Sequence, residues 1–138
     1  MPLLIKNSAF CQVLGTDLRL SLPDVTNDQV WELSPSGSQP RALSLLTTYG
    51  FRASRMHVFP AFTLEDQVIT DPAEFAIFPE ITYSSTGFTV VKFSPFQDID
   101  VFYRLWVPTS QSIVGELACV NNTSLMKTLG VDWLVHLV

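Results

Sequence analysis

Three segments in the second half of the chain alternate strictly between two sets of side chains. In residues 101–107, two Val, a Tyr and a Leu take the odd positions, and Phe, Arg and Trp take the even ones. Residues 113–120 and 129–137 repeat this period of two. Since successive side chains of a strand point to opposite faces of its sheet, each set lies on one face. Turn-forming residues occupy 108–112 and 121–124, so we predict sheet strands joined by short turns.

The rest of the chain favours short strands over long helices, because nine Pro and six Gly interrupt it at short intervals. We expect a hairpin in 9–22, two strands around the turn 84–87, and one helical turn near 72–76. The apolar segment 55–64 contains a proline, which predicts an edge strand or two strand pieces. The chain has the length of one domain. We therefore predict an all-β fold, a single antiparallel β-sandwich domain spanning residues 1–138.

The last predicted strand bears on whether this sandwich is complete. It contains the sequence "VDWLVHLV" and runs to the end of the sequence given. An apolar strand of this kind leaves an edge that invites another strand to pair with it. We expect either that it is paired centrally in its sheet, or that more chain or another protomer completes the sandwich.

The charge content bears on the surface of the sandwich. Charged residues make up 15% of the chain, against about 25% in an average soluble domain, while hydrophobic residues make up 47%. Two explanations stay open: another domain or subunit covers one face, or the faces are rich in Ser and Thr. The net charge of −5, with eight scattered Lys and Arg, argues against a nucleic-acid partner.

Location and cysteine chemistry are predicted from what the sequence lacks. No apolar stretch approaches the roughly 20 residues that a membrane-spanning helix needs. The start, "MPLLIKNSAFCQVLG", lacks the basic leader and long apolar block of a signal peptide, so we expect a cytoplasmic protein with no membrane partner.

Two cysteines, Cys11 and Cys119, are too few for a disulfide framework. Their apolar neighbours favour buried, inert thiols over a bridge or a nucleophile, and the sequence does not show whether they are close.

Catalytic and metal-binding patterns receive little support. Three groups of carboxylates, at 65–66, 71–74 and 98–100, fall in predicted loops, where Asp and Glu commonly face water or satisfy backbone groups. His57 and His136 lie far apart in the sequence, and neither has a partner at a known ligand spacing. No G-x-S-x-G motif and no Gly-rich phosphate loop is present. We expect no catalytic residue, no metal and no cofactor.

Aromatic side chains are the candidates for ligand binding. The predicted carbohydrate-binding residues are Trp106, Tyr103, Arg104 and Trp31, because aromatic faces offer large apolar area to a sugar ring. The alternative for each ring is packing in the core or against a neighbouring domain. For Trp106, which shares its face with Arg104, burial against a neighbour, core packing and ligand stacking all stay open. Trp133 falls on the apolar face of the last strand, where we expect core packing.

A family resemblance rests on two runs, "ASRMHVFPAFTLEDQVITDP" (53–72) and "FSPFQDIDVFYRLWVPTSQSIVGELACVNNTS" (93–124). A strand ends in "WVP", a polar turn follows, and the next strand closes on an N-x-S/T turn before a further apolar strand. Over residues 50–138 this pattern resembles the N-terminal β-sandwich, of the galactose-mutarotase-like (supersandwich) type, of bacterial glycogen-debranching-like glycoside hydrolases and cellobiose-phosphorylase-like enzymes. In those enzymes a separate helical toroid contributes the catalytic carboxylates. The resemblance therefore implies a non-catalytic part of such an enzyme and transfers no catalytic residue.

Three hypotheses remain for the function. The first is a non-catalytic β-sandwich module related to carbohydrate-processing enzymes, acting as a scaffold or docking onto another domain, a subunit or itself through an apolar face. The second is a carbohydrate-binding module that holds an oligosaccharide on surface aromatics. The third is a small sugar-converting, epimerase-like enzyme, which would need a His and a carboxylate converging on one concave face.

Overall fold

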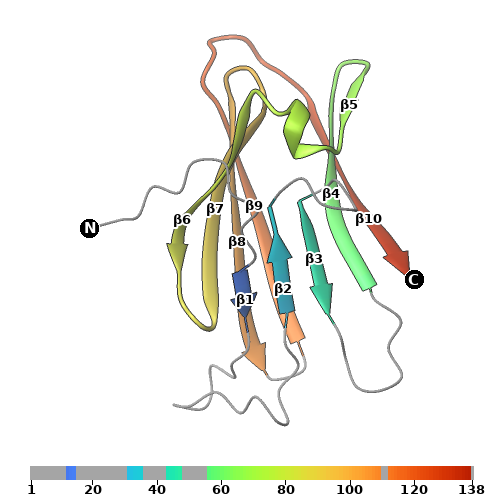
Figure 1. The fold of residues 1–138 in the computed structure, drawn as a ribbon. Helices are drawn as coiled ribbons and strands as arrows, with labels where there is room; N and C mark the ends of the chain where they lie inside the picture. The colour runs from blue at the N-terminus through green and yellow to red at the C-terminus, as the bar shows by residue number, and fades with distance from the viewer. Residues whose placement is uncertain (1–11, 15–30, 36–42, 48–55, 110–111, 138) are drawn as a thin grey trace.

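The computed structural model describes residues 12–14, 31–35, 43–47, 56–109 and 112–137. Two antiparallel sheets lie face to face and enclose the hydrophobic core between them (Figure 1). The predicted all-β antiparallel sandwich is thereby confirmed. The expected helical turn is the short 3-10 helix η1 (Pro72–Glu74), where the Asp71 carboxylate caps the turn by accepting a 2.9 Å hydrogen bond from the Ala73 amide.

Sheet B is built from four consecutive strands, whereas sheet A combines β1 to β5 with the distant strand β10. Sheet A contains β1 (Gln12–Leu14), β2 (Trp31–Ser34), β3 (Ser44–Thr47), β4 (Met56–Leu64), β5 (Gln67–Ile69) and β10 (Leu129–Leu137). Its order is β1-β2-β3-β4-β10, with β5 paired to the second half of β4. Sheet B contains, in this order, β6 (Ile77–Ser84), β7 (Phe88–Phe96), β8 (Ile99–Thr109) and β9 (Ser112–Asn121). The chain therefore enters sheet B with β6 and returns to sheet A with β10.

Strand β8 carries much of the core, and its alternation is the one predicted from the sequence. Its inward-facing side chains are buried: Ile99, Val101, Tyr103, Leu105 and Val107. The side chains between them are only partly covered. Three rings pack together beside this strand, because the Phe93 ring centroid lies 5.5 Å from that of Phe62 and 5.2 Å from that of Phe75. These rings connect β4, β7 and the residue after η1, so they fasten the two sheets to each other.

Strand β4 differs from its prediction as an edge strand or two strand pieces. It is continuous and central, since it pairs with β10 along its full length and with both β3 and β5 on its other side. Pro60 is tolerated because it lies between the residues paired with β3 (56–58) and those paired with β5 (62–64). On that side no described strand requires the N–H that proline lacks.

Hydrogen bonds hold the turns that connect the described strands of sheet B and lead to β10. The predicted strand pair around residues 84–87 is the β6–β7 hairpin, in which the Ser85 amide donates to the Phe88 carbonyl at 2.8 Å. The predicted turn after β9 is held by Asn121, whose Oδ1 accepts hydrogen bonds from the Thr123 amide at 3.0 Å and the Thr123 hydroxyl at 2.7 Å. Of the hairpin predicted in 9–22, only β1 belongs to the described residues.

Candidate functional site

Two of the four predicted carbohydrate-binding residues lie on the outer face of sheet B. Trp106 and Arg104 are adjacent outward-facing residues of β8, and both are partly exposed. Phe88 of β7 is the cross-strand partner of Trp106, which extends the aromatic surface across two strands. The Arg104 guanidinium forms an ion pair with the Glu116 carboxylate of β9, with Nη1 3.0 Å from Oε2. This face is therefore aromatic at Trp106 and Phe88 and carries an ion pair beside them.

The other two predicted residues lie in the interior. Tyr103 is 1% exposed on the inner face of β8, and Trp31 is 6% exposed on β2. Burial raises the pKa of the Tyr103 hydroxyl, because the interior disfavours the phenolate. Stacking on a sugar requires an accessible ring face, which neither side chain offers. The structure thus keeps Trp106 with Arg104 and separates both from Tyr103 and Trp31.

Strand β10 exposes apolar side chains on both of its faces. Trp133, Leu134 and Val135 are 45%, 40% and 59% exposed. The prediction that Trp133 packs in the core is wrong: its ring reaches the Tyr103 ring at a centroid distance of 5.8 Å, but nearly half of its surface stays accessible. The cause is the course of β10, which begins against the core with Leu129 and Val131 and then runs away from sheet B (Figure 1).

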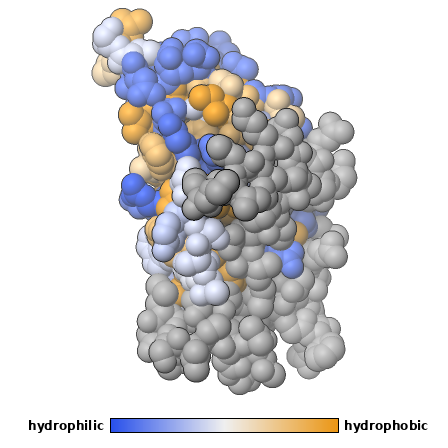
Figure 2. Space-filling view, turned by 60° about the vertical axis from the view of Figure 1, so that its left-hand side comes forward, coloured by the Kyte–Doolittle hydropathy of each residue, from blue (hydrophilic) through white to orange (hydrophobic). Residues whose placement is uncertain are grey.

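The loop between β9 and β10 adds two more accessible apolar side chains. Leu125 is 71% and Met126 is 99% exposed. The Asn121 side chain fixes the loop, since its Nδ2 donates to the Leu125 carbonyl at 2.7 Å. Figure 2 shows hydrophobic atoms at the top of the molecule, at the height where this loop lies in Figure 1. We call the exposed Trp133, Leu134 and Val135 the β10 patch; Leu125 and Met126 lie in the loop that leads to β10.

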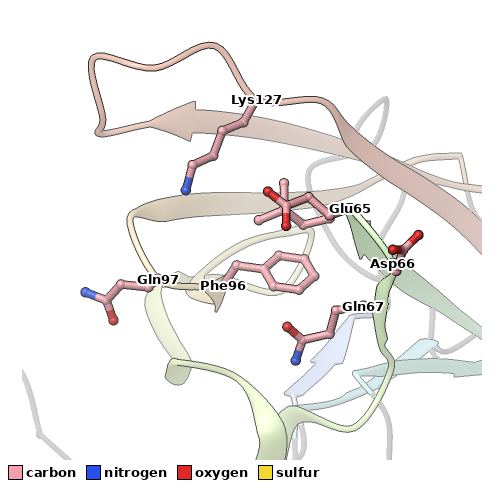
Figure 3. Close-up of a pocket in the computed structure, with 7 residues that line it drawn as sticks. Glu65, Asp66, Gln67, Phe96, Gln97 and Lys127 are labelled. Carbon is pink, nitrogen blue, oxygen red and sulfur yellow. The ribbon is translucent and has the colours of Figure 1, made fainter.

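A shallow depression lies at one end of the sandwich (Figure 3). Its volume is about 700 Å³, and its lining residues are Leu64, Glu65, Asp66, Gln67, Phe96, Gln97 and Lys127. They come from the β4–β5 turn, the β7–β8 turn and the β9–β10 loop (Figure 3). Ligand pockets are usually enclosed by apolar walls with a few converging polar groups, whereas this depression is open and mainly polar. Glu65 and Asp66 are exposed on their turn, in agreement with their interpretation as turn residues.

The two histidines, distant in the sequence, are neighbours in the structure. His57 of β4 and His136 of β10 are cross-strand partners, and their ring centroids are 6.0 Å apart. His57 is buried, His136 is exposed, and neither lines the depression. The epimerase-like hypothesis requires a histidine beside a carboxylate in a hollow, and this placement gives it no support. Among the residues that the structure describes, no three His, Cys, Asp or Glu side chains gather as metal ligands would.

Of the two cysteines, the structure describes Cys119. Cys119 is exposed on β9, contrary to the prediction that it is buried, and it is a free thiol. The partial burial of its sulfur still raises the pKa of the Cys119 thiol, which disfavours the nucleophilic thiolate at neutral pH. Cys11 lies outside the described residues, as does any relation between the two.

No helix within the described ranges has the length and apolar character needed to cross a membrane. Comparison with protein-family models, curated proteins and solved structures finds no match to this chain.

Proposed function

We propose that this chain is a non-catalytic β-sandwich module that docks onto a partner through the β10 patch. The observation that carries the proposal is the uncovered apolar surface of Trp133, Leu134 and Val135 on a strand that ends sheet A in the described part of the chain. Adjacent exposed apolar side chains mark interaction sites, because water contact with them is unfavourable. The edge of β10, with which no strand of the described residues pairs, adds backbone hydrogen-bonding groups that a partner can satisfy.

The class of partner proposed is a domain or subunit of a carbohydrate-processing enzyme. What supports this class is the resemblance of residues 50–138 to the N-terminal sandwich of glucan-processing enzymes. In such an arrangement the catalytic groups come from the partner, and the sandwich contributes a rigid surface.

A dye-binding experiment tests the docking surface directly. At concentrations low enough to keep the chain monomeric, we expect it to bind 8-anilinonaphthalene-1-sulfonate and to leave malto- and cello-oligosaccharides unhydrolysed. The double variant Leu134→Lys/Val135→Lys should lose most of the dye fluorescence, since two charges then occupy the apolar surface. Val68→Lys is the matched control, because Val68 is equally accessible at 60% but lies on β5. Equal fluorescence from all three proteins would remove the β10 patch as the docking surface.

Oligosaccharide binding on sheet B is the second candidate function. The observation that favours it is the aromatic surface formed by Trp106 and its partner Phe88, beside Arg104. Stacking of a sugar ring on an indole ring needs an accessible aromatic face. Calorimetric titration with malto- and cello-oligosaccharides should then give heat that Trp106→Ala abolishes and Trp133→Ala preserves. Absence of heat for the unmodified chain would exclude this function for those sugars.

A further inference from the structure

We propose that the partner of β10 is the β10 strand of a second copy of this chain. The two strands pair antiparallel about a two-fold axis at Leu134, so that Asp132 of each copy lies opposite His136 of the other. This inference rests on the docking function proposed for the β10 patch, but it assigns the patch to a second copy of this chain in place of a carbohydrate-processing partner. Such an interface is isologous, since each copy presents the same surface to the other.

The backbone of β10 presents the hydrogen-bonding groups that this pairing needs. Leu64 and Gln67 close the two-residue turn between β4 and β5, and such a closing pair is hydrogen-bonded. Because bonding directions alternate along a strand, the even residues of β4, including Pro60, point their backbone groups away from β10. The odd residues of β4 therefore bond the even residues of β10. The odd residues of β10, among them Trp133, direct their N–H and C=O groups to the edge where no described strand pairs.

Among the registers with the two-fold axis at residues 132–134, the side chains of β10 favour the one at Leu134. With Leu134 on the two-fold axis, Trp133 pairs with Val135 of the second copy, and Asp132 pairs with His136 of the second copy. The latter pair is attractive because an imidazole N–H donates to a carboxylate. A shift of the axis to Trp133 would instead place Asp132 opposite Leu134. A shift to Asp132 would place two carboxylates opposite each other.

The same register reduces the apolar surface that the single chain leaves accessible. Trp133 and Val135 lie on the face of β10 that is turned toward the core side of sheet A, and Leu134 lies on the other face. Pairing with a second β10 places an apolar side chain beside each of these three residues. Asp132 and His136, both exposed in the single chain, then form the polar pairs that flank Leu134. Trp133 and Leu134 thus gain apolar neighbours, and the Asp132 carboxylate gains a hydrogen-bonding partner.

A charge-exchange series measured by analytical ultracentrifugation tests this register. The unmodified chain should sediment as a concentration-dependent dimer. Asp132→Lys places a cation opposite His136, and His136→Glu places an anion opposite Asp132, so each should raise the dimer dissociation constant about tenfold. The double variant Asp132→Lys/His136→Glu restores opposite charges and should return the constant to within about threefold of the starting value. Glu32→Lys reverses the charge of an exposed residue on β2; it is the matched control and should leave the dimer dissociation constant unchanged.

Cross-linking provides the second measurement and does not depend on charge. Leu134 meets itself across the two-fold axis at a non-hydrogen-bonded pair, where the Cα atoms are close enough for a disulfide. Leu134→Cys, with Cys11 and Cys119 replaced by Ser, should therefore oxidise to a covalent dimer. Failure to cross-link, or a dimer indifferent to the charge series, would overturn the proposal.

The outcomes separate this inference from the function on which it rests. A chain that stays monomeric at several hundred micromolar, yet binds dye at Leu134 and Val135, overturns self-pairing and leaves the docking function standing. A monomer that binds no dye overturns both. The restored double variant also shows that neither substitution is incompatible with the fold, because a substitution that blocked folding would do so in the double variant too.

Discussion

Asp100 is the carboxyl group whose pKa the described contacts lower. Its carboxylate accepts a 2.7 Å hydrogen bond from the Ser94 hydroxyl and lies 3.2 Å from the Lys92 ammonium. The Ser94 hydrogen bond, and then Lys92, lower the pKa of the Asp100 carboxyl below its ordinary value of 3.8. These contacts join β7 to β8 near the start of β8. They therefore stabilise the fold only while the carboxyl is ionised.

Ser94→Ala should raise the pKa of Asp100 toward 3.8, since it removes the largest stabilising contact of the carboxylate. Because the folded-state pKa is the lower one, the contribution of Asp100 is fully present above about pH 4 and is lost as the pH falls through the folded pKa. An NMR titration of the Asp100 carboxyl carbon measures the shift. A pKa that is unchanged in Ser94→Ala would contradict this account.

At the scale of single elements, the β4–β5 turn stores backbone strain. Glu65 has a φ of 56°, in the left-handed region that side chains disfavour. Two-residue hairpin turns often place Gly at their first central position for this reason. The turn residues Glu65 and Asp66 also line the depression shown in Figure 3.

Glu65→Gly should raise the free energy of unfolding by about 0.5–1 kcal/mol, because relief of the left-handed strain exceeds the entropic cost of glycine. Gln67→Gly is the control: Gln67 lies in strand β5, and glycine there should lower the stability by a similar amount. Urea unfolding of both variants measures the difference. A destabilising Glu65→Gly would show that the turn does not require a positive φ.

The sequence predicted the elements well where one physical signal dominated. The period of two placed β8, β9 and β10 and sorted the β8 side chains correctly, since strand geometry alone sets that alternation. The prediction for β4 was wrong, because a proline is excluded from a central strand only where a neighbouring strand needs the N–H that proline lacks. The position of Pro60 between β3 and β5 depends on two turns elsewhere in the chain, which no local pattern contains.

At the scale of the whole molecule, the candidate site depends on how far the two sheets overlap. The alternation correctly put Trp133 on the apolar face of β10, but burial requires that the opposite sheet reach that far. It does so at Leu129 and Val131 and no longer at Val135. Likewise, no spacing in the sequence indicated that His57 and His136 would be neighbours, because their contact arises from the return of the chain to sheet A. Tyr103 lies on the opposite face of β8 from Trp106 and Arg104, a separation that the alternation of this strand already indicated.

Amide hydrogen exchange along β10, followed by NMR, tests most directly whether this strand carries a free edge for docking. In the dilute chain, the amides of Asp132, Leu134 and His136 should exchange slowly because they bond to β4, whereas those of Val131, Trp133 and Val135 should exchange fast. On raising the protein concentration, the second set should become protected as a second copy pairs with it. Equal, slow exchange of both sets in the dilute chain would contradict the account, since the edge would then already be closed within a single molecule.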